Sequence, residues 1–219
     1  MKPYYEQDGI TIYHGDCREV AEWLAADVLV CDPPYGMAFV SSKTTQRREI
    51  AGDKTTAARD AVLALWGDLK PAAIFGTWKV ERPVGVAHRL IWDKQDGSGP
   101  GMGDLSAHFG NSDEEIYLFG AWPKQGARRS NVLRTSTSQA GLTTMIGHPT
   151  PKPVDLMERI IGATAPGASV ADPFAGSGAT LIAAKNLGRK AIGVEIEERY
   201  CEIAAQRLSQ QVLDFGEAA

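Results

Sequence analysis

The clearest indication of the fold of this 219-residue chain is the segment Val170-Ala171-Asp172-Pro173-Phe174-Ala175-Gly176-Ser177-Gly178-Ala179-Thr180. A short apolar run ends at Asp172, two glycines follow, and a helical pattern begins at Ala179. Glycines between a strand and a helix let the backbone approach a ligand closely at the helix N-terminus. Glu195 stands nineteen residues after Gly176. An acid at about this distance from a glycine-rich turn commonly accepts hydrogen bonds from ribose hydroxyls. The stretch therefore predicts a nucleoside-binding strand–turn–helix unit.

The turn departs from two other nucleotide-binding motifs. Leu181 stands where a dinucleotide fingerprint has its third glycine, and the absence of Gly-Lys-Ser/Thr excludes a P-loop. The Asp172 carboxylate would repel a pyrophosphate and attract an ammonium group. S-adenosylmethionine, a nucleoside that carries an amino acid, fits these demands better than NAD or ATP. The alternative interpretation is a tight turn that binds no ligand.

Asp32-Pro33-Pro34-Tyr35 forms a second candidate site, directly after an apolar run, and strand ends of this kind bind ligands in open α/β sheets. The two prolines hold the backbone and leave it without N–H donors, so the Asp32 carboxylate and main-chain carbonyls make the loop rich in acceptors. Such a loop suits an exocyclic amine, and Tyr35 offers a face on which a planar base can stack. The alternative is a Pro-Pro turn with an exposed aromatic side chain.

Apolar runs and helical patterns alternate along the chain, which predicts a mostly parallel sheet covered by helices on both faces. We expect strands over 9–16, 27–32, 72–76, 88–92, 115–119, 168–172 and 190–195. We expect helices over 18–26, 60–68, from 154 onward, over 179–187 and around 200–208. Segments 93–110 and 122–153 show little periodicity.

These motifs together resemble the S-adenosylmethionine-dependent amino-methyltransferases of DNA, which make N6-methyladenine or N4-methylcytosine. The resemblance rests on the glycine-rich turn and on three further segments, His14-Gly15-Asp16-Cys17, Asp32-Pro33-Pro34-Tyr35 and His148-Pro149-Thr150-Pro151-Lys152-Pro153. Because Asp-Pro-Pro-Tyr precedes Phe-Ala-Gly-Ser-Gly, the order is similar to that of the circularly permuted β group. A weaker match is Leu90-Ile91-Trp92-Asp93-Lys94 with Glu115.

The resemblance implies an α/β, Rossmann-like methyltransferase fold with a twisted, mostly parallel sheet and a circularly permuted motif order. It covers nearly the whole chain, so we expect a single methyltransferase domain over 1–219. Within it, residues 93–147 are expected to form a small target-recognition insert. The shortness of that insert predicts a short or relaxed recognition sequence.

The resemblance also implies residue roles, with S-adenosylmethionine as cofactor and direct in-line transfer of its methyl group to nitrogen. The catalytic residues would be Asp32, Pro33, Pro34 and Tyr35. The cofactor would be bound by Asp16, Cys17, His148, Thr150, Lys152, Asp172, Phe174, Ala175, Gly176, Ser177, Gly178, Glu195 and Ile196. Of these, Asp16 would lie near its adenine, Glu195 would hold its ribose, and Lys152, with His148 and Thr150, would lie by its methionine carboxylate. The reaction needs no metal and no covalent enzyme intermediate.

The formal net charge of −4 argues against a DNA partner, because proteins contact the negative phosphates of DNA mainly through Lys and Arg. The deficit, however, lies wholly in residues 195–219, which hold six acids and two bases. Basic residues cluster in two other segments, which we expect to contact DNA: Lys43, Arg47, Arg48, Lys124, Arg128, Arg129 and Arg134. The alternative is that both clusters are solvated faces.

The cysteines and histidines indicate a reduced, metal-free protein. Cys17, Cys31 and Cys201 are odd in number and widely spaced, which predicts free thiols in the cytoplasm. Cys31 lies inside the apolar run rather than at a loop tip after a proline, so we expect an inert core residue and not the nucleophile of a C5-cytosine methyltransferase. The histidines lack spaced metal-ligand partners, and no apolar run approaches 18 residues, so we expect neither a metal site nor a membrane span.

The sequence leaves alternatives open for the substrate and for the activity itself. Asp rather than Ser at position 32 favours N6-adenine within the family, and N4-cytosine in DNA is the alternative. RNA or protein amine substrates, and a module that binds the cofactor without methylating, are less favoured. Many permuted relatives are dimers, which leaves a homodimer open.

Overall fold

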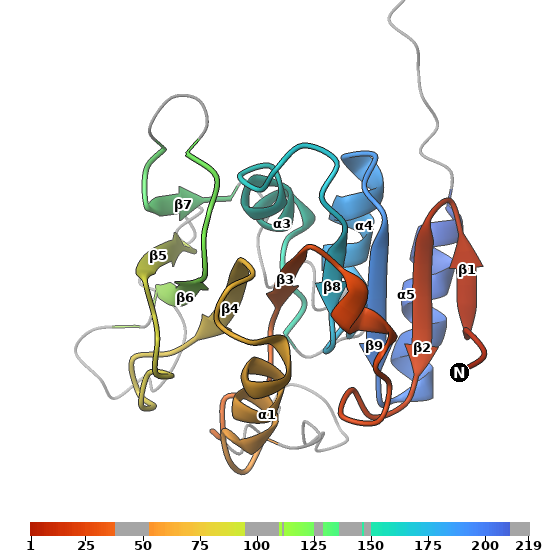
Figure 1. Cartoon of the computed structure of the whole chain (residues 1–219), viewed down its shortest axis with the longest axis horizontal. Helices are drawn as coiled ribbons and strands as arrows, with labels where there is room; N and C mark the ends of the chain where they lie inside the picture. Colours follow the sequence, from red (N-terminus) through yellow and green to blue (C-terminus); the bar gives the residue numbers. More distant parts are fainter. Residues whose placement is uncertain are drawn as a thin grey trace, which may run out of the picture.

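The computed structural model describes residues 1–37, 53–94, 110, 112–124, 129–135, 146 and 150–210. Among these residues, nine strands form one sheet in the order β1-β2-β9-β8-β3-β4-β6-β5-β7 (Figure 1). The strands are β1 Tyr5–Gln7, β2 Ile10–His14, β3 Val28–Cys31, β4 Ala72–Gly76, β5 His88–Asp93, β6 Asp113–Phe119, β7 Val132–Arg134, β8 Val170–Asp172 and β9 Ala191–Glu195.

The central strands β2, β9, β8, β3 and β4 are parallel to one another. β6 runs antiparallel to β4 and β5, and β1 runs antiparallel to β2. This mixed but mostly parallel sheet confirms the expected α/β class. Strands β1 and β7, at the two ends of the sheet, were not expected from the sequence. Each has three residues, which is too short for a periodic pattern.

Helices cover both faces, as the alternating pattern predicts. α1 (Ala57–Trp66) and the 3₁₀ turn η1 (Glu22–Ala25) lie on one face, where Trp23 and Trp66 stack with their rings 5.9 Å apart. α3 (Val154–Ile161), α4 (Ala179–Asn186) and α5 (Glu198–Ser209) lie on the other, with their apolar residues against Val28 and Val30 of β3. No helix of the described ranges is long and apolar enough to cross a membrane.

The helix expected over 18–26 is wrong, because the structure has only the 3₁₀ turn η1 there. The Asp16 carboxylate accepts a hydrogen bond from the Arg18 amide at 2.9 Å, which favours a turn at the start of the segment. The Trp23 indole donates to the Cys17 carbonyl at 2.9 Å and is itself completely buried. A segment this short gains little from helix cooperativity, so these tertiary contacts set its conformation.

The sheet reverses its winding between β8 and β3. From β8 the chain continues through α4 to β9 on one side, whereas from β3 it continues through α1 to β4 on the other. In open α/β sheets, ligands bind at the carboxyl ends of the strands at such a switch point. The glycine-rich turn follows β8 and Asp32 follows β3, so both predicted motifs lie at this position.

Candidate active site

The glycine-rich turn begins α4 and packs closely against α5. Gly176 and Gly178 have φ angles of 48° and 82°, a left-handed conformation that favours glycine. A Cβ on Gly178 would lie 2.9 Å from the Cβ of Ala204 in α5. Glycine is therefore needed at position 178 for both the backbone conformation and the packing against α5.

Two buried acids flank this turn. Asp172 is 3% exposed, and its Oδ1 accepts a hydrogen bond from the Phe174 amide at 3.0 Å. Burial raises the pKa of Asp172 to about 7. Glu195 is 8% exposed and accepts hydrogen bonds from the Gly176 and Glu197 amides, each at 2.8 Å, while burial raises its pKa as well. Among the described residues no cation pairs with either carboxylate, so the pair suits a ligand that brings an ammonium group and hydroxyl donors.

The end of β2 lies beside the end of β9. The Gly15 amide donates to the Glu195 carbonyl at 2.9 Å, which brings Asp16 to the same edge of the sheet. Arg18 pairs with Asp16 and lowers the pKa of its carboxyl. Ile196, the next residue after Glu195, is 52% exposed and offers an apolar face at this edge. The Cys17 side chain is buried in the core beneath.

The Asp-Pro-Pro-Tyr loop is folded back on itself at the end of β3. The Tyr35 hydroxyl donates to Asp32 Oδ1 at 2.5 Å, and Pro33 is buried. Burial raises the pKa of Asp32 despite the opposing effect of the nearby Lys152. The loop thus presents a partly buried carboxylate whose Oδ1 still has a second lone pair for an amine.

Lys152 lies against Asp32, although the family resemblance assigned it to the cofactor carboxylate. Its Nζ is 2.5 Å from Asp32 Oδ2 and 3.3 Å from Glu114 Oε2, and its side chain is 4% exposed. The ammonium also lies 5.1 Å from the centre of the Phe75 ring. Burial would lower the pKa of Lys152, but the two carboxylates raise it on balance, so the residue is a buried cation.

Glu114 is a site residue that the sequence reasoning missed. Its Oε1 pairs with Lys94 Nζ at 2.5 Å, and its Oε2 is 3.3 Å from the Tyr35 hydroxyl. Burial alone would raise the pKa of Glu114, but Lys152 and Lys94 lower it overall. The available signal was the pair Glu114-Glu115 at the start of an apolar strand, because strand alternation directs one acid to each face of the sheet.

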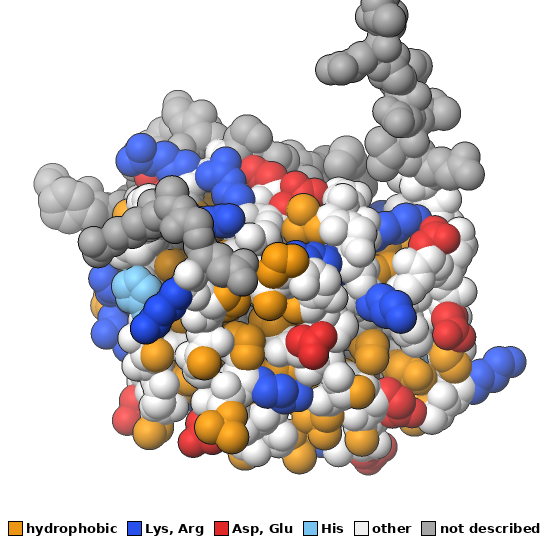
Figure 2. Space-filling view, turned by 45° about the horizontal axis from the view of Figure 1, so that its top comes forward, with side chains coloured by type: hydrophobic (Ala, Val, Ile, Leu, Met, Phe, Trp, Pro, Cys, Tyr) orange, Lys and Arg blue, Asp and Glu red, His pale blue; other side chains and the backbone are white. Residues whose placement is uncertain are grey.

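The basic residues expected to contact DNA do not all lie on one side of the described structure. Lys43, Arg47, Arg48 and Arg128, together with the expected cofactor residue His148, lie outside the described residues. Arg134 ends β7 and pairs with Asp93 at 2.9 Å, on the edge that carries the site. Lys124 follows the opposite end of β6, and Arg129 donates to the Gly162 carbonyl at 3.1 Å beyond the end of α3. In Figure 2, Lys and Arg side chains are most crowded at the left, the end of the molecule that holds β5, β6 and β7.

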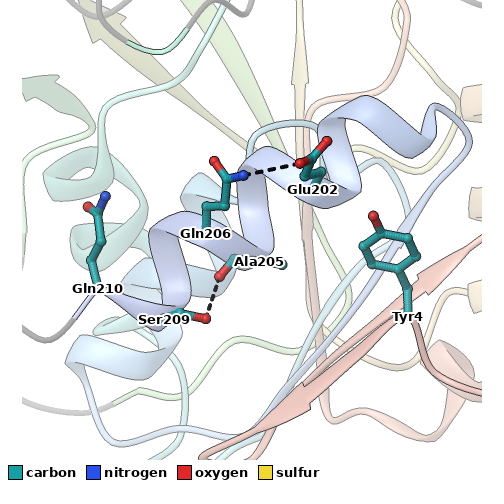
Figure 3. Close-up of a pocket in the computed structure, with 6 residues that line it drawn as sticks. All are labelled: Tyr4, Glu202, Ala205, Gln206, Ser209 and Gln210. Carbon is teal, nitrogen blue, oxygen red and sulfur yellow. Dashed lines mark hydrogen bonds between the residues drawn. The ribbon is translucent and has the colours of Figure 1, made fainter.

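A shallow depression lies away from this edge, between Tyr4 and α5 (Figure 3). Gln206 donates to Glu202 at 3.2 Å and Ser209 donates to the Ala205 carbonyl at 2.8 Å, so its polar side chains are largely satisfied within α5. It contains neither predicted motif, and we assign it no role in the chemistry.

Comparison with known proteins identifies the family. The N6/N4 methyltransferase family, described as DNA methylase, matches residues 79–206, and the type II methyltransferase M2.DpnII of Streptococcus pneumoniae is 49% identical over 96% of this chain and 93% of its own length. The chain belongs to this DNA methylase family. A putative methylase of Escherichia coli K12, YubD, is 31% identical over 93% of both chains. The predicted resemblance to DNA amino-methyltransferases is thereby confirmed.

Solved structures of DNA methylases share the fold. The complex of M1.HpyAVI with SAM is 26% identical, covers 91% of this chain and all of its own, and has a TM-score of 0.62. The cytosine-N4-specific PvuII DNA methyltransferase reaches a TM-score of 0.68 over 97% of this chain at 18% identity, which shows the fold alone. The Rossmann-like methyltransferase fold is therefore confirmed.

Proposed function

We propose that this DNA methylase transfers a methyl group from S-adenosylmethionine to the exocyclic N6 of an adenine flipped out of DNA. The observation that carries the proposal is the Asp32 carboxylate on an acceptor-rich loop, at the same switch point as the glycine-rich turn. Transfer to N4 of cytosine is the alternative, and Asp at position 32 favours adenine within the family. The type II relatives also support a role in restriction–modification.

The residues around the glycine-rich turn fit the cofactor. The buried Asp172 would pair with its ammonium group, and Glu195 would accept hydrogen bonds from its ribose. Asp16 and the exposed Ile196 would lie beside the adenine ring of the cofactor. When bound, S-adenosylmethionine supplies a methyl group on a sulfonium, which an amine nitrogen can attack directly.

The residues of the Asp-Pro-Pro-Tyr loop would bind and orient the target amine. Asp32 would accept one N–H of the amine, and the Pro33 carbonyl, on a backbone without donors, would accept the other. Hydrogen bonds to both hydrogens favour a localised lone pair on the nitrogen, aimed at the cofactor. The nitrogen must lose one proton on methylation, and burial raises the pKa of Asp32, which makes this carboxylate a better proton acceptor than an exposed aspartate.

The DNA would approach the edge of the sheet where the strands end. Flipping a base costs a few kcal/mol of unstacking, which contacts to the flanking duplex must offset. Of the described basic residues expected to contact DNA, Arg134 lies at this edge with its side chain 75% exposed, so we propose that it contacts a phosphate. We retain residues 93–147 as the recognition region of a single domain, although β6 and β7 within it belong to the main sheet.

The test is transfer of label from S-adenosylmethionine to unmethylated DNA, followed by digestion to nucleosides. Label in N6-methyladenine supports the proposal, whereas label in N4-methylcytosine supports the alternative. Transfer to RNA but not to DNA would overturn both. Cofactor binding without any transfer would indicate a module that has lost catalysis.

A further inference from the structure

The strongest unexplained feature of the site is a buried network of opposite charges on the α3 side of the sheet. Lys152 stands before α3, Asp32 after β3 and Glu114 near the start of β6, so three separate parts of the chain meet there. Lys152 Nζ lies between the two carboxylates, at 2.5 Å from Asp32 and 3.3 Å from Glu114. A buried ammonium is costly unless such partners compensate it, so the arrangement must be set by the fold as a whole.

The two carboxylates differ in what else holds them. Glu114 has a second cation, because Lys94 Nζ lies 2.5 Å from its other oxygen. Asp32 has Lys152 alone among the cations, within the part of the chain that the structure describes, and its remaining hydrogen bond comes from Tyr35. The pair Glu114 and Lys94 can therefore anchor Lys152, while Asp32 is the group whose charge and orientation depend on it.

We propose that Lys152 is a positioning residue for methyl transfer: anchored by Glu114, it holds the Asp32 carboxylate toward the target amine and does not bind the cofactor carboxylate. The inference rests on the proposed function. Lys152 occupies Asp32 Oδ2, which orients the carboxylate and leaves the second lone pair of Oδ1 for the amine. Its charge also favours the ionised form of Asp32, the form that can accept a hydrogen bond from the amine.

The sign of the pH effect follows from the groups that face Asp32. These are Lys152 before α3, Glu114 on β6, Asp172 on β8, Tyr35 on its own loop and, through Glu114, Lys94. Lys152 lowers the pKa of Asp32, whereas Glu114 raises it. Removing Lys152 should therefore move the acid limb of the activity profile to higher pH, and removing the charge of Glu114 should move it to lower pH.

The experiment compares Lys152→Met, Glu114→Gln and Glu115→Gln in the full chain, with kcat against pH on DNA and S-adenosylmethionine affinity by calorimetry. Lys152→Met should lower kcat roughly 100-fold, the scale of a misplaced catalytic group, with cofactor affinity unchanged. Lys152→Arg, which keeps the charge, should recover part of the rate and return the acid limb toward its original pH. The effects of Lys152→Met and Glu114→Gln should be non-additive in the double variant, because both act on Asp32.

Glu115→Gln is the matched control, because Glu115 is the next residue along β6, is 2% exposed and is also ion-paired, to Arg82 and Arg89. The Glu115 side chain faces the opposite side of the sheet, beside Tyr117. The substitution should therefore lower the stability of the protein without moving the pH profile of kcat. Weakened cofactor binding with kcat retained in Lys152→Met would overturn the inference alone. An acid limb that shifts equally in Glu115→Gln would do the same. A wild-type protein that methylates no DNA would instead overturn the proposed function.

Discussion

At the residue scale, burial raises the pKa of Asp172 from its ordinary value of 3.8 to about 7. Between these two pKa values, the Asp172 carboxyl is protonated in the folded chain and ionised in the unfolded chain. This contribution to stability is complete below about pH 4 and is lost as the pH rises through about 7. In Asp172→Asn, which does not titrate, we expect the free energy of unfolding relative to wild type to grow over this range, by up to roughly 4 kcal/mol.

Urea unfolding from pH 4 to pH 8 measures this difference. Asp27→Asn is the control of opposite sign, because hydrogen bonds from Ser169 lower the pKa of Asp27. That variant should be less stable than wild type throughout this range and should approach it only below pH 3.8, the ordinary pKa of the carboxyl group. Parallel stability curves for Asp172→Asn and wild type would contradict the expected burial effect.

Asp172→Asn should also weaken S-adenosylmethionine binding, since it removes the negative charge proposed to face the ammonium group of the cofactor.

At the residue scale, the proposed function assigns the chemistry to Asp32. Asp32→Ala removes the carboxylate proposed to orient the amine, so transfer should fall at least roughly 100-fold, as for other groups that stabilise developing charge. S-adenosylmethionine binding should be retained, because the cofactor residues surround the neighbouring strand end. Single-turnover assays and calorimetry separate the two quantities. A variant that loses cofactor binding but keeps the residual turnover would contradict the role assigned to Asp32.

At the scale of elements, the junction between α4 and α5 depends on Gly178. Alanine there would combine a φ of 82° with a Cβ contact of 2.9 Å to Ala204, so we expect a loss of about 2 to 4 kcal/mol in stability. Gly188→Ala is the matched control: its φ is 64°, but a Cβ there would meet nothing within 4 Å. It should cost about 1 to 2 kcal/mol, from backbone strain alone. Equal losses in urea unfolding would mean that packing against α5 contributes nothing.

At the scale of the whole molecule, the arrangement of charge predicts how DNA binds. Arg134 lies on the edge that carries the site, whereas Lys124, from the same basic run, follows the opposite end of β6. Arg134→Ala should therefore weaken DNA binding and reduce the slope of log K against log salt by about 1, the share of one phosphate contact.

Lys124→Ala serves as the control for that measurement, since it removes the same charge from the other edge. Fluorescence anisotropy with a labelled duplex at several salt concentrations gives both slopes. A slope unchanged in Arg134→Ala but reduced in Lys124→Ala would place the DNA on the opposite edge of the sheet. Binding insensitive to salt in the wild type would exclude phosphate contacts as its main source.

Much of the fold and part of the site could be predicted because their signals are local. The turn around Gly176 and the loop after Asp32 are short segments whose composition reflects their own backbone geometry. The prediction was weakest where distant contacts decide the outcome. The 3₁₀ turn at Glu22–Ala25 depends on the Trp23 indole and on its packing against Trp66, which lies far along the chain. Strands β1 and β7 form only because neighbouring strands pair with them.

The α/β class, the order of the motifs and the acids beside the glycine-rich turn could all be predicted from the sequence, because each is visible in short local patterns of residues. The contact of Lys152 with Asp32 and Glu114 emerges only in the folded chain, because the three residues come from segments over 35 residues apart. The tertiary structure also separates Arg134 from Lys124, although the two belong to one basic run. The physical reason is the same in both cases: charges act over a few ångströms of space, and the winding of the sheet sets those distances.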